Sequence, residues 1–170
     1  KKQIKPTYDK NILPYNDSYL IAFKDRKYGF IGWDNRPAGE FQFDQIEYWN
    51  DSIAWVKKDD MWALYDIKRA NTVIGDIKNY TIIKNNPIEK IVIVQQGSSY
   101  GVFSTLRGEV LPITYSDIIN LGSENKPLYF TEKHVEEASL FVVIYYNYEG
   151  RLIRRQAFDA DHYDDIYCSK

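Results

Sequence analysis

Cysteine, long apolar runs and an excess of one charge are all missing from this sequence, and each absence narrows the possible functions. The 170 residues include one cysteine, Cys168, which excludes an intramolecular disulfide and a thiolate metal cluster. No apolar run approaches the ~20 residues that cross a bilayer, so we do not expect a membrane-spanning chain. The 22 basic and 24 acidic residues are intermixed without a Lys/Arg stripe, so nucleic acid is not an expected partner.

Signatures of catalysis are also missing. His134 and His162 are the only histidines, and neither lies in a zinc spacing such as HExxH. There is no GxSxG and no glycine-rich phosphate loop. We therefore expect a chain that is not an enzyme, with no catalytic residue and no cofactor.

Acidic residues near the C-terminus come closest to a metal site. Asp159, Asp161, Asp164 and Asp165 lie around His162 and offer the oxygen ligands that calcium prefers. They lack the glycine that calcium loops use for their turn, so we expect a solvated terminal strand and no metal.

Aromatic residues are abundant, at 16% of the chain, and they follow an internal repeat. Residues 15–34, "YNDSYLIAFKDRKYGFIGWD", align without a gap over residues 49–68, "WNDSIAWVKKDDMWALYDIK". Each copy has a short apolar run, a polar turn, and an aromatic residue followed by a very small one. These pairs are Tyr28-Gly29, Trp62-Ala63 and Tyr100-Gly101. A fixed recurrence of this length predicts a repeat architecture.

A second motif lies between these pairs and places a carboxylate after an aromatic residue. It is seen at Tyr8-Asp9, in "FDQI" at 43–46, at Tyr115 with Asp117, and at Tyr163-Asp164, and it has decayed to "GDI" at 75–77. The two motifs together divide the chain into repeats at 15–48, 49–86 and 87–126, with a partial repeat at 1–14 and a divergent one at 127–170.

Short runs with period-two alternation predict the secondary structure. "SYLIAF", "KYGFIGW", "SIAWV", "WALYDI", "KIVIVQ", "YGVFS" and "LFVVIYYNY" are rich in β-branched and aromatic residues and are separated by turn residues. We expect one all-β repeat domain over residues 1–170, built from antiparallel hairpins or meanders in an open twisted array. Closure into a propeller-like ring is the alternative. Thr131 begins an inserted segment that forms either a short capped helix or an extended hairpin loop.

The pairing of the two motifs resembles the WG-containing, or KWG, repeat family. The resemblance rests on the aromatic-small pairs above and on "IKPTYD" at 4–9 and "LPITYSD" at 111–117. It implies a bacterial β-repeat module without assigned catalytic residues, often in exported or surface proteins. The chain starts partway through a repeat and without an initiating Met, so we expect flanking repeats or domains in a longer protein.

The recurring glycine has an architectural interpretation. Glycine inside a strand marks a bulge or a close approach of another group. We expect Gly29 and Gly101 to let an aromatic side chain of a neighbouring repeat lie on the backbone, as Ala63 nearly allows.

The remaining aromatic residues suggest binding. Trp33 and Trp55 align with apolar residues of other repeats, so we expect core packing for both. Trp49 and Tyr15 share a position beside the "NDS" turn, which we expect to lie near the surface. Tyr146 and Tyr148 are expected on one strand face and Tyr145 on the other.

Three functions are open at this point. The first is a non-catalytic binding or scaffolding module for another protein, in a bacterial envelope or surface protein. The second is a carbohydrate-binding module that uses exposed aromatics, with Trp33 and Trp49 the first to test. The third is a hydrolase that uses two of the C-terminal carboxylates across a cleft.

Overall fold

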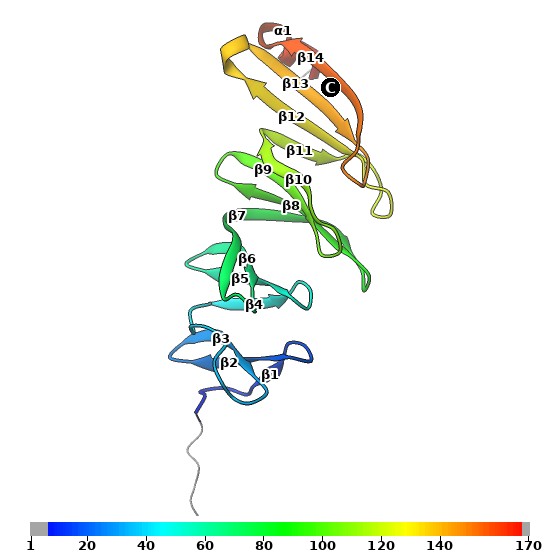
Figure 1. Ribbon diagram of the computed structural model, residues 1–170. Helices are drawn as coiled ribbons and strands as arrows, with labels where there is room; N and C mark the ends of the chain where they lie inside the picture. The colour runs from blue at the N-terminus through cyan, green and yellow to red at the C-terminus, as the bar shows by residue number, and fades with distance from the viewer. Residues whose placement is uncertain (1–6, 168–170) are drawn as a thin grey trace, which may run out of the picture. The chain divides into compact units, whose positions relative to one another are not determined.

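The computed structural model describes residues 7–167 and confirms an all-β chain of antiparallel hairpins and meanders (Figure 1). Three sheets hold the strands in the orders β1-β2-β3, β4-β5-β6-β7-β8-β9-β10 and β11-β12-β13-β14, and none closes into a barrel. The contacts divide the chain into two compact units, residues 1–78 and 79–170, which are described in turn.

The first compact unit holds two hairpins. Its strands are β1 (Leu13–Pro14), β2 (Tyr19–Lys24), β3 (Lys27–Gly32), β4 (Gln45–Tyr48), β5 (Ile53–Lys58), β6 (Met61–Asp66) and the first half of β7 (Asn71–Asn85). Alternation sends Ala54 and Val56 of β5 to one face, where they pack with Phe30, Phe43 and Tyr65. Trp55, between them, stacks instead with Trp49 and Trp62.

The second compact unit continues with the rest of β7, β8 (Lys90–Gln96), β9 (Ser99–Ser104) and β10 (Gly108–Tyr115). A four-stranded meander follows: β11 (Asp117–Asn120), β12 (Tyr129–Val135), β13 (Leu140–Tyr146) and β14 (Leu152–Asp159). Ile91, Val102, Leu111, Ile118 and Tyr129 belong to one buried cluster between these strands. The seven runs named from the sequence are therefore confirmed as β2, β3, β5, β6, β8, β9 and β13, whereas β1, β4, β7, β10, β11, β12 and β14 were not among the predicted runs.

The first compact unit contains two repeats, and the hairpin turn of each adopts the same left-handed backbone. Asp25 and Arg26 have φ of 52° and 67°, and Asp59 and Asp60 have φ of 49° and 65°. Two consecutive positive φ values define a type I′ turn, whose twist matches that of the flanking strands. The "KDRK" and "KKDD" segments are thus equivalent turns.

The small residue of each aromatic-small pair lies under the strand or loop that returns onto the hairpin. A Cβ built on Gly101 would lie 2.7 Å from Ile113 Cγ1 and 3.0 Å from the Ile113 amide nitrogen. A Cβ on Gly29 would lie 2.9 Å from Phe41 Cγ. The expected close approach is confirmed, but the expected source was wrong: both covering residues come from the same repeat as their glycine, and Ile113 is not aromatic.

The carboxylate of the second motif ties each repeat to the next hairpin. Asp44 donates its N–H to the Lys57 carbonyl, and its Oδ2 accepts from the Asp59 N–H at 3.0 Å. Asp9 makes the same pair of bonds with Phe23 and Asp25. A side chain that satisfies a turn amide in this way fixes where the turn lies.

The third copy of this tie departs from the expected alignment. Ser116, not Asp117, donates its N–H to Glu132 and accepts from the His134 N–H through Oγ. The Asp117 carboxylate instead accepts from the N–H of the adjacent Ile118. "GDI" is not a copy of the motif either, because Ile77 pairs with Trp62 as Tyr115 pairs with Tyr100.

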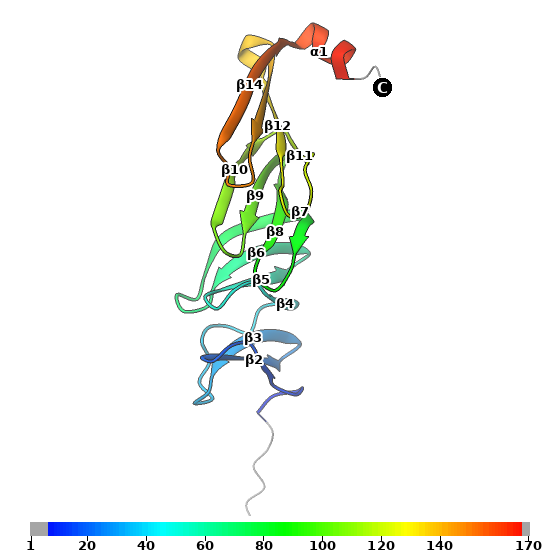
Figure 2. The same cartoon turned by 90° about the vertical axis from the view of Figure 1, so that its right-hand side faces the viewer.

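For the fourth repeat, one expectation was wrong, and one alternative left open by the sequence is decided by the structure. The C-terminal acidic segment forms helix α1 (Ala160–Tyr167) instead of a solvated strand, and Figure 2 shows it continuing from β14. Tyr163 of α1 stacks on Phe141 of β13, with ring centroids 4.3 Å apart, and this apolar contact holds the helix. Thr131 caps no helix: it lies in β12, and the insertion is a hairpin loop that contains a 3-10 turn, Glu136–Ala138.

Among residues 7–167, no helix is both long and apolar enough to pass through a lipid bilayer.

We expect Gly101→Ala to lower the free energy of unfolding by about 2 kcal/mol, because the added methyl meets Ile113 backbone atoms that cannot rotate away. The measurement is urea unfolding followed by tyrosine and tryptophan fluorescence. The reverse change at the equivalent position, Ala63→Gly, is the control and should cost about 1 kcal/mol or less. Equal stability of Gly101→Ala and the wild type would contradict this account.

Candidate binding surface

Asparagine residues begin each hairpin by holding the loop that precedes it. The Oδ1 of Asn16 accepts from the N–H groups two and three residues later, and Asn50 and Asn86 do the same. Asn120 accepts from Gly122 and, across a longer loop, from Leu128. These are Asx turns, which fix a loop without help from a regular strand. The first two are the asparagines of "NDS", whereas the later two lack that signature.

The two residues whose amides donate to Asn86 differ sharply in exposure. Ile88 is 79% exposed, whereas Glu89 is only 6% exposed. A buried carboxylate is costly unless it is paired and hydrogen-bonded. The residues around Glu89 supply those partners.

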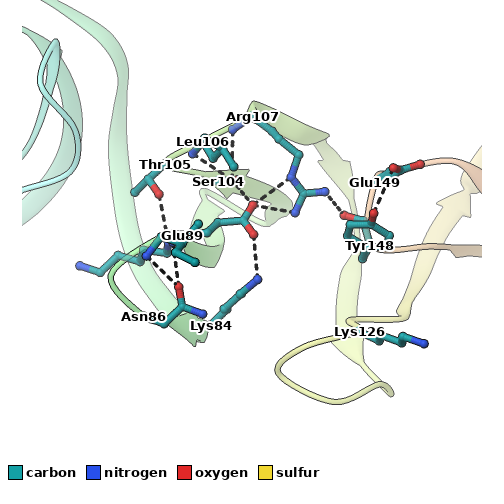
Figure 3. Close-up of polar contacts among 12 residues, drawn as sticks. Lys84, Asn86, Glu89, Ser104, Thr105, Leu106, Arg107, Lys126, Tyr148 and Glu149 are labelled. Atoms are coloured by element: carbon teal, nitrogen blue, oxygen red, sulfur yellow. Dashed lines mark hydrogen bonds and ion pairs between the residues drawn. The ribbon is translucent and has the colours of Figure 1, made fainter.

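Three side chains surround the Glu89 carboxylate in the second compact unit (Figure 3). Ser104 Oγ donates to Oε1 at 2.6 Å, and Lys84 Nζ lies 3.0 Å from Oε2. Arg107 donates Nε to Oε1 at 2.9 Å, and its Nη2 lies 2.8 Å from the same oxygen. One negative charge therefore lies between two positive charges, with a hydroxyl as a further donor.

The environment of Glu89 sets its protonation. Burial by itself raises the pKa of Glu89, but hydrogen bonds from Ser104, Lys84 and Arg107 together outweigh burial and hold the pKa below its ordinary value. Tyr129 is fully buried nearby, and desolvation raises its pKa to about 12. Glu89 is therefore ionised and Tyr129 neutral at neutral pH.

Arg107 also connects two loops. Its Nη1 donates to the Tyr148 carbonyl, and its guanidinium carbon lies 5.1 Å from the Tyr148 ring centroid. The turn after β9 is thereby joined to the turn after β13 (Figure 3). Leu106, beside Arg107, is 67% exposed, and Tyr148 is 44% exposed.

We call Ile88, Leu106, Arg107 and Tyr148 the loop cluster. It presents exposed apolar and aromatic side chains from three loops that the Glu89 network connects. Arginine and tyrosine are enriched at protein interfaces, and exposed apolar groups held together mark interaction sites. The cluster offers recognition chemistry and no nucleophile or general base.

The aromatic residues predicted to bind are placed differently from expectation. Trp33, expected in the core, is 64% exposed because it follows the last residue of β3 and lies in a turn. Trp49 and Tyr15, expected near the surface, are buried at 4% and 9%. Trp49 stacks on Trp55, and the Tyr15 hydroxyl donates to the Asn50 and Ile53 carbonyls. Trp33 and Trp49 therefore do not form an exposed pair.

Tyr145 and Tyr146 lie in β13 and follow the expected alternation, whereas Tyr148 lies beyond the end of the strand. Tyr145 packs edge-on against Phe130, whereas the Tyr146 hydroxyl meets the Tyr115 hydroxyl at 2.8 Å in another cluster. Tyr148 lies beyond the end of β13, in the turn, and belongs to the loop cluster. Tyr146 is thus half-buried packing, and Tyr148 is the one available to a partner.

The C-terminal carboxylates do not assemble a site among the described residues. Asp159 ends β14 and Asp161 lies in the first turn of α1, while the side chains of Asp164 and Asp165 lie outside what is described. Within the described part of the chain, no three His, Cys, Asp or Glu side chains gather to hold a metal ion.

Sequence reasoning missed most of the loop cluster. Ile88, Leu106 and Arg107 lie on two separate loops of the repeat at 87–126, and none of them belongs to a recurring motif. One signal was present: Asn86 lies at nearly the same spacing from Asn50 as Asn50 from Asn16, and it marks the loop that carries Ile88 and Glu89.

Comparison with known proteins adds little. No protein-family model matches the chain, and no curated protein matches it. Among solved structures, that of Kluyveromyces lactis Hsv2p aligns with 9% identity and a TM-score of 0.31, over 86% of this chain and 63% of that one. The aligned part is thus under two thirds of that protein's length, and a likeness at this score supports no inference about fold or function.

We expect Glu89→Gln to cost about 3 kcal/mol of stability at pH 7, because it leaves Lys84 and Arg107 partly buried without their counter-charge. The wild-type contribution is complete at neutral pH, since the folded pKa lies below the unfolded one, and it is lost as the pH falls below the ordinary value of 4.5. Urea unfolding between pH 7 and pH 3 should therefore show a weaker pH dependence for the variant.

The control for this experiment is Asp60→Asn, which breaks the exposed pair with Lys57. It should change stability little at any pH. If Glu89→Gln behaved like this control, the network would not be holding the loops.

Proposed function

We propose that this chain is a non-catalytic binding module whose partner is another protein. The loop cluster carries the proposal: Ile88, Leu106 and Tyr148 are exposed, yet they lie on loops fixed by Asn86, Glu89 and Arg107. Single exposed apolar residues are ordinary on a protein surface, but apolar residues from connected loops favour a recognition role.

Rigidity strengthens this interpretation. A binding loop that is already ordered loses less conformational entropy when the partner arrives. The Asx turn at Asn86 and the three donors to Glu89 supply that order before binding. A buried charge network that served stability alone would not need exposed apolar neighbours.

The glycan alternative has weaker support. Stacking on sugars needs exposed aromatic faces placed together, and of the two proposed residues Trp33 is exposed while Trp49 is buried. The hydrolase alternative has no geometric support among the described carboxylates. We therefore keep protein binding as the proposed function.

The WG-containing repeat resemblance remains an inference. What supports it is the recurrence of a small residue beneath a returning segment, at Gly29 and Gly101. The proposals of flanking repeats and of a bacterial envelope or surface location derive from that resemblance alone.

The proposal predicts that binders need the loop cluster. Peptides selected on the wild-type chain from a random display library should bind Ile88→Ser or Leu106→Ser at least tenfold more weakly, because each change removes an exposed apolar contact. Calorimetric titration would measure the affinity. Both side chains are largely exposed, so neither change should impair folding.

Leu152→Ser is the matched control, since Leu152 is 58% exposed but lies on β14 outside the loop cluster. It should leave affinity unchanged. Selected binders that ignore both loop substitutions would show that the loop cluster is not the binding surface.

A further inference from the structure

In each of the three recognisable repeats, the aromatic residue of the aromatic-small pair lies opposite a residue of the returning segment, and that residue differs between repeats. Tyr28 pairs with Phe43, Trp62 with Ile77, and Tyr100 with Tyr115. The same spacing along the chain separates the partners in every pair. These pairs therefore place the returning segments of the repeats in register with one another.

Two residues before each pairing residue lies the one that covers the small residue of the hairpin. In the first repeat this is Phe41, which covers Gly29, and in the third it is Ile113, which covers Gly101. By the count from Ile77, the equivalent residue of the second repeat is Gly75, which lies in the register shift that β7 makes as it passes Ala63. The second repeat thus has no side chain where the others have a bulky one.

A pocket of about 470 Å³ opens beside Gly75 and Ala63, within the first compact unit. Phe43 and Val56 are among its apolar lining residues. Its volume falls in the range of roughly 300–1,000 Å³ that ligand sites occupy. We call it the Ala63 pocket.

The first repeat shows what such a position accepts. There the Phe41 ring stacks on the Tyr8 ring, with centroids 5.9 Å apart and planes 24° apart. Tyr8 precedes Asp9 as Phe43 precedes Asp44, and both carboxylates make the same tie to the following turn. Phe43 is therefore the equivalent of Tyr8, and a ring in the Ala63 pocket would lie against it as Phe41 lies against Tyr8.

The charged residues of the Ala63 pocket favour a basic neighbour for that ring. Lys58 donates to Gln42 at 2.9 Å, so its charge lies beside a neutral amide. Asp59 and Asp76 also line the pocket, and neither forms an ion pair with a described residue. The lining carries one positive and two negative charges, which complements a cationic segment.

We propose that the Ala63 pocket binds the phenyl ring of a phenylalanine in an extended basic peptide segment of a partner protein. The ring takes the place that Phe41 and Ile113 occupy in the other repeats, and lysine or arginine beside it pairs with Asp59 and Asp76. The site goes beyond the loop cluster, which belongs to the other compact unit.

The test uses synthetic peptides of defined sequence. One is an eight-residue peptide with a central Lys-Phe-Lys, and its controls replace Phe by Gly or both Lys by Glu. Calorimetric titration of the wild-type chain should show binding of the Lys-Phe-Lys peptide at least tenfold tighter than of either control. Equal binding of all three, or none, would overturn the proposal.

Two variants test the location. Gly75→Ile supplies the side chain that the third repeat carries, and should weaken binding at least tenfold. A Cβ there meets only the Thr72 methyl at 3.2 Å, so we expect the variant to fold. Ala63→Gly enlarges the pocket and should keep or strengthen binding, and Leu152→Ser, on β14 of the other compact unit, should leave it unchanged. Binding that survives Gly75→Ile would overturn the proposal.

Two further measurements keep the test decisive. If Gly75→Ile fails to fold, nuclear Overhauser contacts between the peptide ring and the Ala63 methyl in the wild-type chain replace it, and their absence would overturn the proposal. Free phenylalaninamide should bind at least tenfold more weakly than the Lys-Phe-Lys peptide. If it bound equally well, a peptide segment would not be the ligand.

Discussion

The close approach of a returning segment to the small residue of each hairpin is the constraint on which the repeats depend. At Gly101 the backbone of Ile113 occupies the space that a side chain would need. This contact explains why the aromatic residue of each pair is followed by a very small one. It also accounts for the register shift opposite Gly101 and opposite Ala63, since the returning strand bulges where it crosses the hairpin. The surrounding aromatic residues vary because the backbone approach, rather than one particular ring, is what recurs.

Polar side chains then fix the loops between these contacts. Asn16, Asn50 and Asn86 satisfy the amides that precede each hairpin, and Asp9 and Asp44 satisfy amides in the following turns. Each such bond is worth about 1 kcal/mol net, so the set matters more than any member. In the second compact unit the same device places Glu89 inward and Ile88 outward, so that an ordinary loop tie becomes the support of an exposed surface.

The fold was largely predictable from local pattern, and the site was not. The apolar runs "SIAWV" and "KIVIVQ" are short, rich in β-branched residues and bounded by turn residues, and they predict β5 and β8, whose central residues are buried on both faces of the sheet. The helix at Ala160–Tyr167 was missed because Tyr163 holds it through contacts with β13 and β14, which leave no helical pattern in the sequence. Trp33 and Trp49 were misplaced because alignment between repeats says which positions correspond, but not which of them a neighbouring segment covers. The loop cluster and the Ala63 pocket depend on residues brought together from separate segments. Nothing in the local sequence around Gly75 predicts the pocket, because it exists where the other repeats carry Phe41 and Ile113.

The most direct test of this account is a double-mutant cycle at Gly29 and Phe41, with the free energy of unfolding measured for four proteins. Gly29→Ala alone places a methyl 2.9 Å from Phe41 Cγ, whereas Gly29→Ala with Phe41→Gly reproduces the pair that Ala63 and Gly75 form naturally. If close approach is the governing constraint, Gly29→Ala costs much less in the Phe41→Gly background, with a coupling energy of about 1–3 kcal/mol. Additive effects of the two substitutions would contradict it.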